Sequence, residues 1–329
     1  MAIAFLLLLS CLAGCRGKTE PSNQSMISQG NRYDWDTSRH PETETLQVGF
    51  FPNGVNGEQL DYENPTVSYD NGPMTCDFSL TCDGTRKINC TLFVTVNGYI
   101  QPFRVENGGE EQTSYTIPVK EEDFQKISLT IDRPVYLSSE HPSYVAIHLL
   151  ANYDELLENE SDEGSYSLSV YEFFRISPVS SDLATKEFPP SASAEEVGAV
   201  QNGLPDEAVG YNGISYGVVR DEDQTGMPSF KRWMKNDSSE NYRLALQQEA
   251  GRYRTILLRD GQLVEAFGGK SYLDWESSGL GNYWEVPISP DVLGKGSHIY
   301  YAVTYCLDIM NGDTVQCPFL VTEPYTIVV

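Results

Sequence analysis

Cys90-Thr91-Leu92-Phe93-Val94-Thr95-Val96, followed by Asn97-Gly98, is the stretch of sequence that decides how this chain folds. Every second residue from Cys90 to Val96 is apolar, which is the period of a β-strand with one buried face. The Asn-Gly pair that follows supplies the positive φ angles of a tight hairpin turn. Residues 90–98 therefore predict a strand that ends in a β-hairpin.

The same alternation occurs on both sides of this stretch. Residues 75–82 read Thr-Cys-Asp-Phe-Ser-Leu-Thr-Cys, and alternating segments follow at 127–131 and 166–170. Hydrophobic residues make up 40% of the 329 residues, which is enough to build real cores. Helices are expected to be short. The sequence thus predicts an all-β chain.

The order of these segments repeats in the second half of the chain. Because each copy has roughly 130 residues and short, turn-bounded strands, we predict two tandem domains that resemble immunoglobulin-like β-sandwiches. One large β domain split by a long loop is the alternative. The matched pairs are Phe78–Leu80 with Tyr242–Leu246, Phe93–Gly98 with Ile256–Gly261, Tyr115–Val119 with Trp284–Ile288, and Ile127–Ile131 with Ile299–Tyr305.

Domain boundaries follow from changes in composition along the chain. The segment between the two copies is rich in Ser, Pro and Ala, which is typical of a linker. We predict a signal peptide at 1–14, a lipidated Cys and disordered tether at 15–44, sandwich modules at 45–176 and 197–329, and a linker at 177–196.

The N-terminus predicts export. Ala2 to Leu12 form an apolar run that is too short for the roughly 20 residues of a membrane span. The run ends in Leu12-Ala13-Gly14-Cys15, which resembles the lipobox of bacterial lipoproteins. The resemblance implies that Cys15 receives a diacylglyceryl group and anchors the chain to the cell membrane or outer membrane, facing the extracytoplasmic side. An ordinary secretory signal would export the protein as well.

Charge narrows the range of partners. The chain has 22 Lys plus Arg and 47 Asp plus Glu, a formal net charge of −25. Such a chain lacks the basic face that nucleic-acid binding requires, so no nucleic-acid partner is expected. The tether reaches roughly 30 Å on average, which would hold an acidic body clear of an anionic membrane. The membrane is therefore expected as a partner through the lipid anchor.

Two cysteines near the C-terminus suggest a cross-link. Asn311-Gly312 lies midway between Cys306 and Cys317, so a two-residue hairpin would set the two thiols opposite one another. The separation of such a pair, about 5.5 Å between α-carbons, is compatible with a disulfide. Cys76, Cys82 and Cys90 lie on presumed inward faces and are expected to act as small buried hydrophobes.

The second copy carries aromatic residues where the first has none. They could stack on sugars or seat a protein partner, because aromatic side chains are enriched in binding hot spots. The alternative is that the rings cap the core of the sandwich. The candidate ligand-binding residues are Tyr272, Trp275, Tyr283 and Trp284.

Catalytic and metal sites find little support in the sequence. No catalytic residue and no metal ligand can be assigned, since no nucleophile or His/Cys group occurs in a convincing motif. Asp221 begins a stretch that resembles a calcium loop, but Arg232 stands where a bidentate Glu belongs. No cofactor is expected, although loop carboxylates leave a structural Ca²⁺ open.

These observations favour a non-enzymatic surface lipoprotein that presents β-sandwich modules to an envelope protein or a glycan, in interaction or adhesion. Fold analogy supports this role, since sandwich loops bind without catalytic residues. A structural subunit of an envelope, export or nutrient-capture assembly is the first alternative. A glycan-active enzyme is the second, because 47 acidic residues do not let the sequence choose or reject a catalytic pair.

Replacing Cys15 by Ser should abolish lipid attachment, because the thiol is the acceptor that the lipobox resemblance implies. We expect cells fed labelled palmitate to label the wild-type protein and not Cys15→Ser, as read by autoradiography of the purified chain. Cys11→Ser, in the apolar run, is the control and should label normally. Equal labelling of Cys15→Ser would refute the anchor.

Overall fold

Strand pairing in the computed structural model gives an almost entirely β chain built from four sheets. Residues 1–46, which include the predicted signal peptide, Cys15 and the whole predicted tether, lie outside the described residues. The structure describes residues 47–61, 64–83, 88–105, 109–119, 124–138, 141–152, 169–179, 187–203, 212–216, 233–235, 242–310, 318–322 and 325–328.

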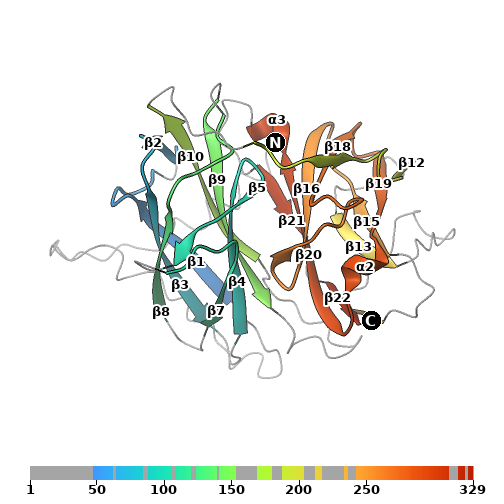
Figure 1. The fold of residues 1–329 in the computed structure, drawn as a ribbon, viewed down its shortest axis with the longest axis horizontal. Coiled ribbons are helices and arrows are strands. Elements are labelled where there is room, and N and C mark those ends of the chain that lie inside the picture. The colour runs from blue at the N-terminus through green and yellow to red at the C-terminus, as the bar shows by residue number, and fades with distance from the viewer. Residues whose placement is uncertain are drawn as a thin grey trace, which may run out of the picture. The chain divides into compact units, whose positions relative to one another are not determined.

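The first sandwich consists of two sheets (Figure 1). One sheet has the order β1-β3-β8-β6 and the other β2-β10-β9-β4-β5, with β7 also paired to β4. The strands are β1 (Gln47–Val55), β2 (Thr66–Tyr69), β3 (Met74–Asp83), β4 (Ile88–Val96), β5 (Tyr99–Gln101), β6 (Arg104–Val105), β7 (Tyr115–Val119), β8 (Phe124–Ile131), β9 (Ser143–Asn152) and β10 (Ser169–Pro178).

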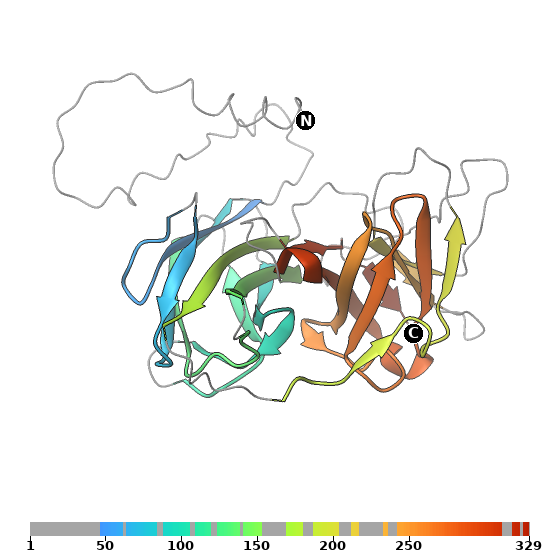
Figure 2. The ribbon, with the colours of Figure 1, turned by 90° about the horizontal axis from the view of Figure 1, so that it is seen from above.

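The second sandwich also pairs two sheets (Figures 1 and 2). One has the order β12-β19-β15-β13 and the other β11-β18-β16-β20-β22-β14, with β17 beside β16 and β21 beside β20. The elements are β11 (Ser191–Ser193), β12 (Val200–Gly203), β13 (Asn212–Tyr216), β14 (Trp233–Lys235), β15 (Tyr242–Leu246), β16 (Gly251–Arg259), β17 (Gln262–Leu263), β18 (Tyr272–Ser277), β19 (Asn282–Pro287), α2 (Pro290–Leu293), β20 (Ser297–Cys306), α3 (Leu307–Met310), β21 (Phe319–Val321) and β22 (Tyr325–Val328).

The prediction of an all-β chain with two immunoglobulin-like sandwiches is confirmed by this topology. In the first sandwich, β1, β3 and β8 occupy the places of strands A, B and E, and β10, β9 and β4 those of G, F and C. A short strand, β2, runs parallel to β10, and in the second sandwich β14 runs parallel to β22 in the same way. The two sandwiches therefore share the plan of these seven strands, whereas β12 stands beside β19 where the first sandwich has β6 beside β8.

The predicted strand matches are half correct. β3 corresponds to β15, and β4 to β16, as the sequence predicts. The remaining matches are wrong by one strand, because β7 corresponds to β18, β8 to β19 and β9 to β20. A shared Pro and an alternating pattern mark β7 and β19 as strands, but they do not specify which sheet each strand joins.

The hairpin turn that follows the central strand has the same backbone conformation and the same clamp on the next strand in both copies. Asn97 and Asp260 have φ angles of 49° and 50°, and each is followed by a glycine at positive φ. The backbone N–H of Asn97 donates to the Tyr144 carbonyl, and the Tyr144 N–H donates to Asn97 Oδ1 at 2.9 Å. Asp260 makes the same exchange with Ile299. This clamp fixes the start of β9 and of β20.

The central strands are buried on both faces, which corrects the expectation of one buried face. Thr91, Phe93 and Thr95 are as buried as the apolar residues between them, and β16 and β20 are buried along most of their length. The reason is a shared core: the cluster that fills the first sandwich continues across Phe93 to Ile256 and Tyr301 of the second. Each central sheet thus packs on two neighbours.

The contacts between the two central sheets are reciprocal. A Cβ placed on Gly98 of the first hairpin turn would lie 3.1 Å from the Tyr305 ring, on β20. A Cβ on Gly261 of the second turn would lie 2.2 Å from Thr91, on β4. Each turn therefore packs on a central strand of the other sandwich, and at Gly261 the approach leaves no room for a side chain larger than hydrogen. Residues Glu44–Val329 accordingly form one compact unit.

A side-chain hydrogen bond fixes α2 to the start of β20 in the second sandwich. The Tyr300 hydroxyl, at the start of β20, donates to the Leu293 carbonyl in α2 at 2.5 Å, which is the tyrosine corner of immunoglobulin-like folds. α2 and α3 are single turns, as the sequence predicts.

Within the described part of the chain, no helix combines the length and the apolar character needed to cross a bilayer.

Replacing Asp260 by Ala should lower the free energy of unfolding by about 2 kcal/mol, because it leaves the buried Ile299 N–H without its acceptor and puts Ala at a positive φ. Asp260→Asn is the matched control, since Asn holds the equivalent place in the first copy and keeps the acceptor. Urea unfolding followed by circular dichroism measures the difference. Equal losses in both variants would contradict the clamp.

Candidate functional site

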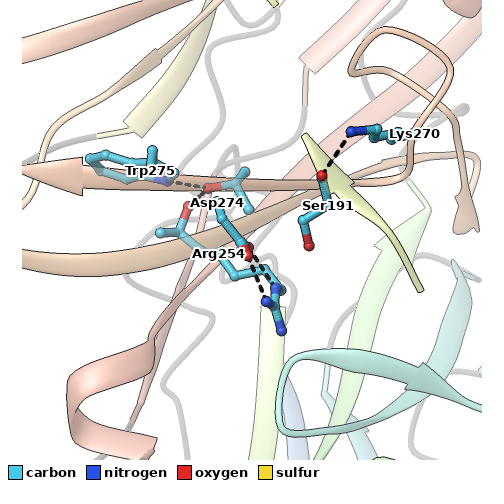
Figure 3. Close-up of polar contacts among 7 residues, drawn as sticks. Ser191, Arg254, Lys270, Asp274 and Trp275 are labelled. Atoms are coloured by element: carbon cyan, nitrogen blue, oxygen red, sulfur yellow. Dashed lines mark hydrogen bonds and ion pairs between the residues drawn. The ribbon is translucent and has the colours of Figure 1, made fainter. Parts of the chain in front are cut away.

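Residues 187–199, which we call the strap, join the second sandwich next to its contact with the first. Strand β11 of the strap pairs in parallel with β18, and Lys270 Nζ donates to the Ser191 carbonyl at 3.0 Å (Figure 3). Lys270 also pairs with Glu196 at 3.2 Å. A hydrogen bond from the Ser193 backbone, with the nearby Lys270, lowers the pKa of the Glu196 carboxyl. These contacts hold the strap in one place.

The strap places Phe188 on a group of rings that we call the junction cluster: Tyr99, Tyr136, Phe188, Arg254 and Tyr272. Phe188 lies 5.2 Å from the Tyr99 ring and 5.8 Å from the Tyr136 ring, between centroids. Tyr99 is the centre, because Tyr136 and Tyr272 each lie 5.0 Å from it. Phe188 remains 49% exposed while the other rings are buried.

Arg254 completes the cluster from the second sandwich. Its guanidinium makes two 2.7 Å hydrogen bonds to Asp274 (Figure 3). It also lies 4.1 Å from the centre of the Tyr99 ring. A bidentate pair of this kind is geometrically specific, and stacking on an aromatic face adds attraction between the opposed surfaces. Tyr99 belongs to the first sandwich, so the pair ties the two sandwiches together at this edge.

The Tyr272 hydroxyl joins the sandwiches by another contact. It accepts a hydrogen bond from the Ile100 backbone N–H at 3.2 Å. Burial raises the pKa of Tyr272 to about 12, and the hydrogen bond from Ile100 opposes that shift. The phenol is therefore neutral at all physiological pH values, and it acts as a fixed acceptor.

A strained residue lies under the exposed ring. Tyr136 has a φ of 64°, which is rare for a bulky side chain and costs energy unless its surroundings fix it. Here Asn97 Nδ2 donates to the Tyr136 carbonyl at 2.9 Å, and Gln101 Oε1 accepts from the Val135 N–H at 2.9 Å. The hairpin thus holds this loop so that the Tyr136 ring supports Phe188.

The candidate rings named from the sequence do not gather at one surface. Tyr272 lies in the junction cluster, whereas Trp275 and Tyr283 are buried, and Trp284 is half-buried. Trp275 Nε1 donates to Thr255 Oγ1 at 2.9 Å (Figure 3), and Tyr283 donates to Glu285 at 2.8 Å. Trp275 therefore belongs to the core of the second sandwich, in which it stacks on Tyr253 at 4.8 Å.

The predicted Cys306 hairpin is wrong. Cys306 is followed by α3 rather than a two-residue turn, and β21 returns to pair Tyr305 with Phe319. The Cys306 thiol is free, and Cys317 lies outside the described residues. A helical turn intervenes because Met310 is buried in the shared core. Cys76 and Cys90 are buried, as expected, and burial raises the pKa of Cys76.

No cluster of metal-ligating side chains occurs among the residues that the structure describes. The calcium-like stretch from Asp221 to Arg232 lies outside them. Sequence reasoning missed the Arg254–Asp274 pair and the role of Phe188. The signal for Phe188 was present in Phe188-Pro189-Pro190, because an aromatic residue next to two prolines has few conformations and gives a rigid contact.

Comparison with known proteins gives limited likeness. No family model and no curated protein matches this chain. Among solved structures, the CARDB domain of the PF1109 protein from Pyrococcus furiosus, in complex with di-metal ions, matches 42% of this chain and 97% of its own, with 9% identity and a TM-score of 0.25. The N-terminal domain of PorA matches 40% and 97%, with 16% identity and a TM-score of 0.23.

Replacing Arg254 by Ala should lower the free energy of unfolding by about 2 kcal/mol, since it removes a partly buried bidentate pair and its ring contact. Arg252→Ala is the matched control on the same strand. Arg252 is 57% exposed in its pair with Asp308, so its loss should cost less than about 1 kcal/mol. Urea unfolding measures both, and equal losses would contradict a role for Arg254 at the junction.

Proposed function

We propose that this chain is a non-enzymatic, lipid-anchored surface protein whose paired sandwiches bind a protein partner at the junction cluster. One observation carries the proposal. The half-exposed Phe188 ring rests on buried Tyr99 and Tyr136, and a strap fastened by Lys270 holds it there. A rigid aromatic ring loses little entropy on binding, and such rings are typical of interface hot spots.

The charge of the chain favours a protein over a glycan. A net charge of −25 attracts a partner with a basic surface and accelerates the encounter, whereas a neutral sugar is insensitive to it. Glu187 and Glu195, both exposed, lie in the same strap as Phe188. We therefore expect the partner to combine an apolar contact with Lys or Arg at its rim, and its binding to weaken as salt rises.

Replacing Phe188 by Ser should abolish partner binding without unfolding the protein, because the ring is half exposed. The measurement is recovery of envelope proteins on the immobilised full-length chain, beside a glycan array probed with the same chain. We expect specific envelope proteins to be retained by the wild type and recovery to fall at least tenfold in Phe188→Ser.

Val179→Ser is the control, since Val179 is 71% exposed and follows β10 outside the junction cluster. It should leave recovery unchanged. Retention that survives Phe188→Ser, or a glycan ligand whose binding ignores salt, would refute the proposal of a protein partner at this cluster.

A further inference from the structure

A histidine lies in the middle of the face between the two central sheets. His148, on β9, stacks on Phe93 at 4.5 Å and is covered by Phe319 of β21, also at 4.5 Å. The ring is fully buried. His148 Nε2 lies 3.1 Å from the Tyr305 hydroxyl, on β20, and its Nδ1 has no hydrogen-bond partner. This ring is therefore held by both sandwiches.

The other copy shows that packing does not require a histidine here. Counted from the matched hairpin clamps, His148 corresponds to Val303, and Tyr305 corresponds to Leu150. Val303 and Leu150 are buried in the same shared core. The pair of Val303 and Leu150 is therefore aliphatic, whereas the corresponding pair of His148 and Tyr305 is polar.

We propose that His148 is an acid-sensitive latch: protonation of its ring opens the face between the β4–β9 and β16–β20 sheets while each sandwich keeps its own core. Protonation of the ring costs free energy because of the groups that surround it. A buried cation needs an opposite charge or several acceptors, and an imidazolium here would carry an additional N–H at Nδ1 with nothing to accept it.

The groups that face the ring offer no compensation. Among the described residues, Phe93 of β4 and Phe319 of β21 are apolar, and Tyr305 of β20 presents a neutral phenol. The charged residue on this side of β10 is Arg175, which lies over the Tyr144 ring and is itself a cation. No described carboxylate contacts His148, and burial lowers its pKa from 6.5 to about 3.

The direction of the pH effect follows from this shift. In the open state the ring is solvated and titrates near 6.5, whereas in the closed state it stays neutral down to about pH 3. The closed state is therefore fully stabilised well above pH 6.5, and the opening equilibrium increases nearly tenfold for each pH unit between about 5.5 and 4. Between pH 6.5 and 4.5 the open population should increase about 50-fold, since half of the open-state rings are already protonated at pH 6.5.

The test is labelling of a thiol placed on this face of the full-length protein. Ala146→Cys puts a small thiol at a buried position two residues from His148, and the native Cys76 reports on the core of the first sandwich. 4,4′-Dithiodipyridine reacts with thiols at acid pH, and peptide mapping separates the sites. We expect the introduced thiol to react about 50-fold faster at pH 4.5 than at pH 6.5, relative to an exposed thiol, while Cys76 stays protected.

Two further variants assign the effect to the latch. His148→Val carries the residue of the other copy and should make labelling at the introduced thiol independent of pH, and His148→Asn serves the same purpose if the Val variant does not fold. His141→Val, a partly exposed histidine, is the control and should respond as the wild type. The proposal is overturned by an unchanged rate in acid, by joint labelling of Cys76, or by an acid response that persists without His148.

Discussion

Two sheets that are each buried on both faces impose the constraint on which the rest of this structure depends. The sheet of β4 and β9 packs inward on its own sandwich and outward on the sheet of β16 and β20. Both faces must then be apolar or hydrogen-bonded, which is why Thr255 bonds to Thr304 and Tyr305 to Thr95 within the buried layers. Loops, strap and junction cluster all take their positions from these layers.

The reciprocal contacts of the hairpin turns resemble those of a symmetric dimer formed by two copies of one module. In such an isologous interface, a patch meets the same patch on its partner. Here Gly98 meets Tyr305, and Gly261 meets Thr91, which pairs across its sheet with Leu150, the residue that corresponds to Tyr305. After duplication within one chain, the two halves can keep this packing while their sequences diverge. Arg254 can then stand where the first copy has Thr91, and stack on Tyr99.

The sequence predicted the positions of the strands better than it predicted which strands pair with one another. Alternation located β3 and β4, and the Asn-Gly and Asp-Gly pairs located both hairpins, because these signals are local. What it could not show is which strands share a sheet edge, since β7 and β19 look alike in sequence. The consecutive apolar residues Ile256-Leu257-Leu258 indicate burial on both faces of the strand. A strand with one buried face already accounts for every second residue of such a run, so these three residues did not distinguish the two cases.

The same reasoning explains why the candidate rings fell into different places. Tyr272 and Trp275 are three residues apart in one strand, so their side chains must point to opposite faces of the sheet. One face meets the first sandwich and the other meets the core of the second, and no single surface can hold both rings. Phe188 escapes this alternation because it lies in an irregular segment before β11. The exposed ring of the junction cluster therefore lies in the segment that connects the two sandwiches. Two modules in one chain have one such connection, so this part of the structure is asymmetric.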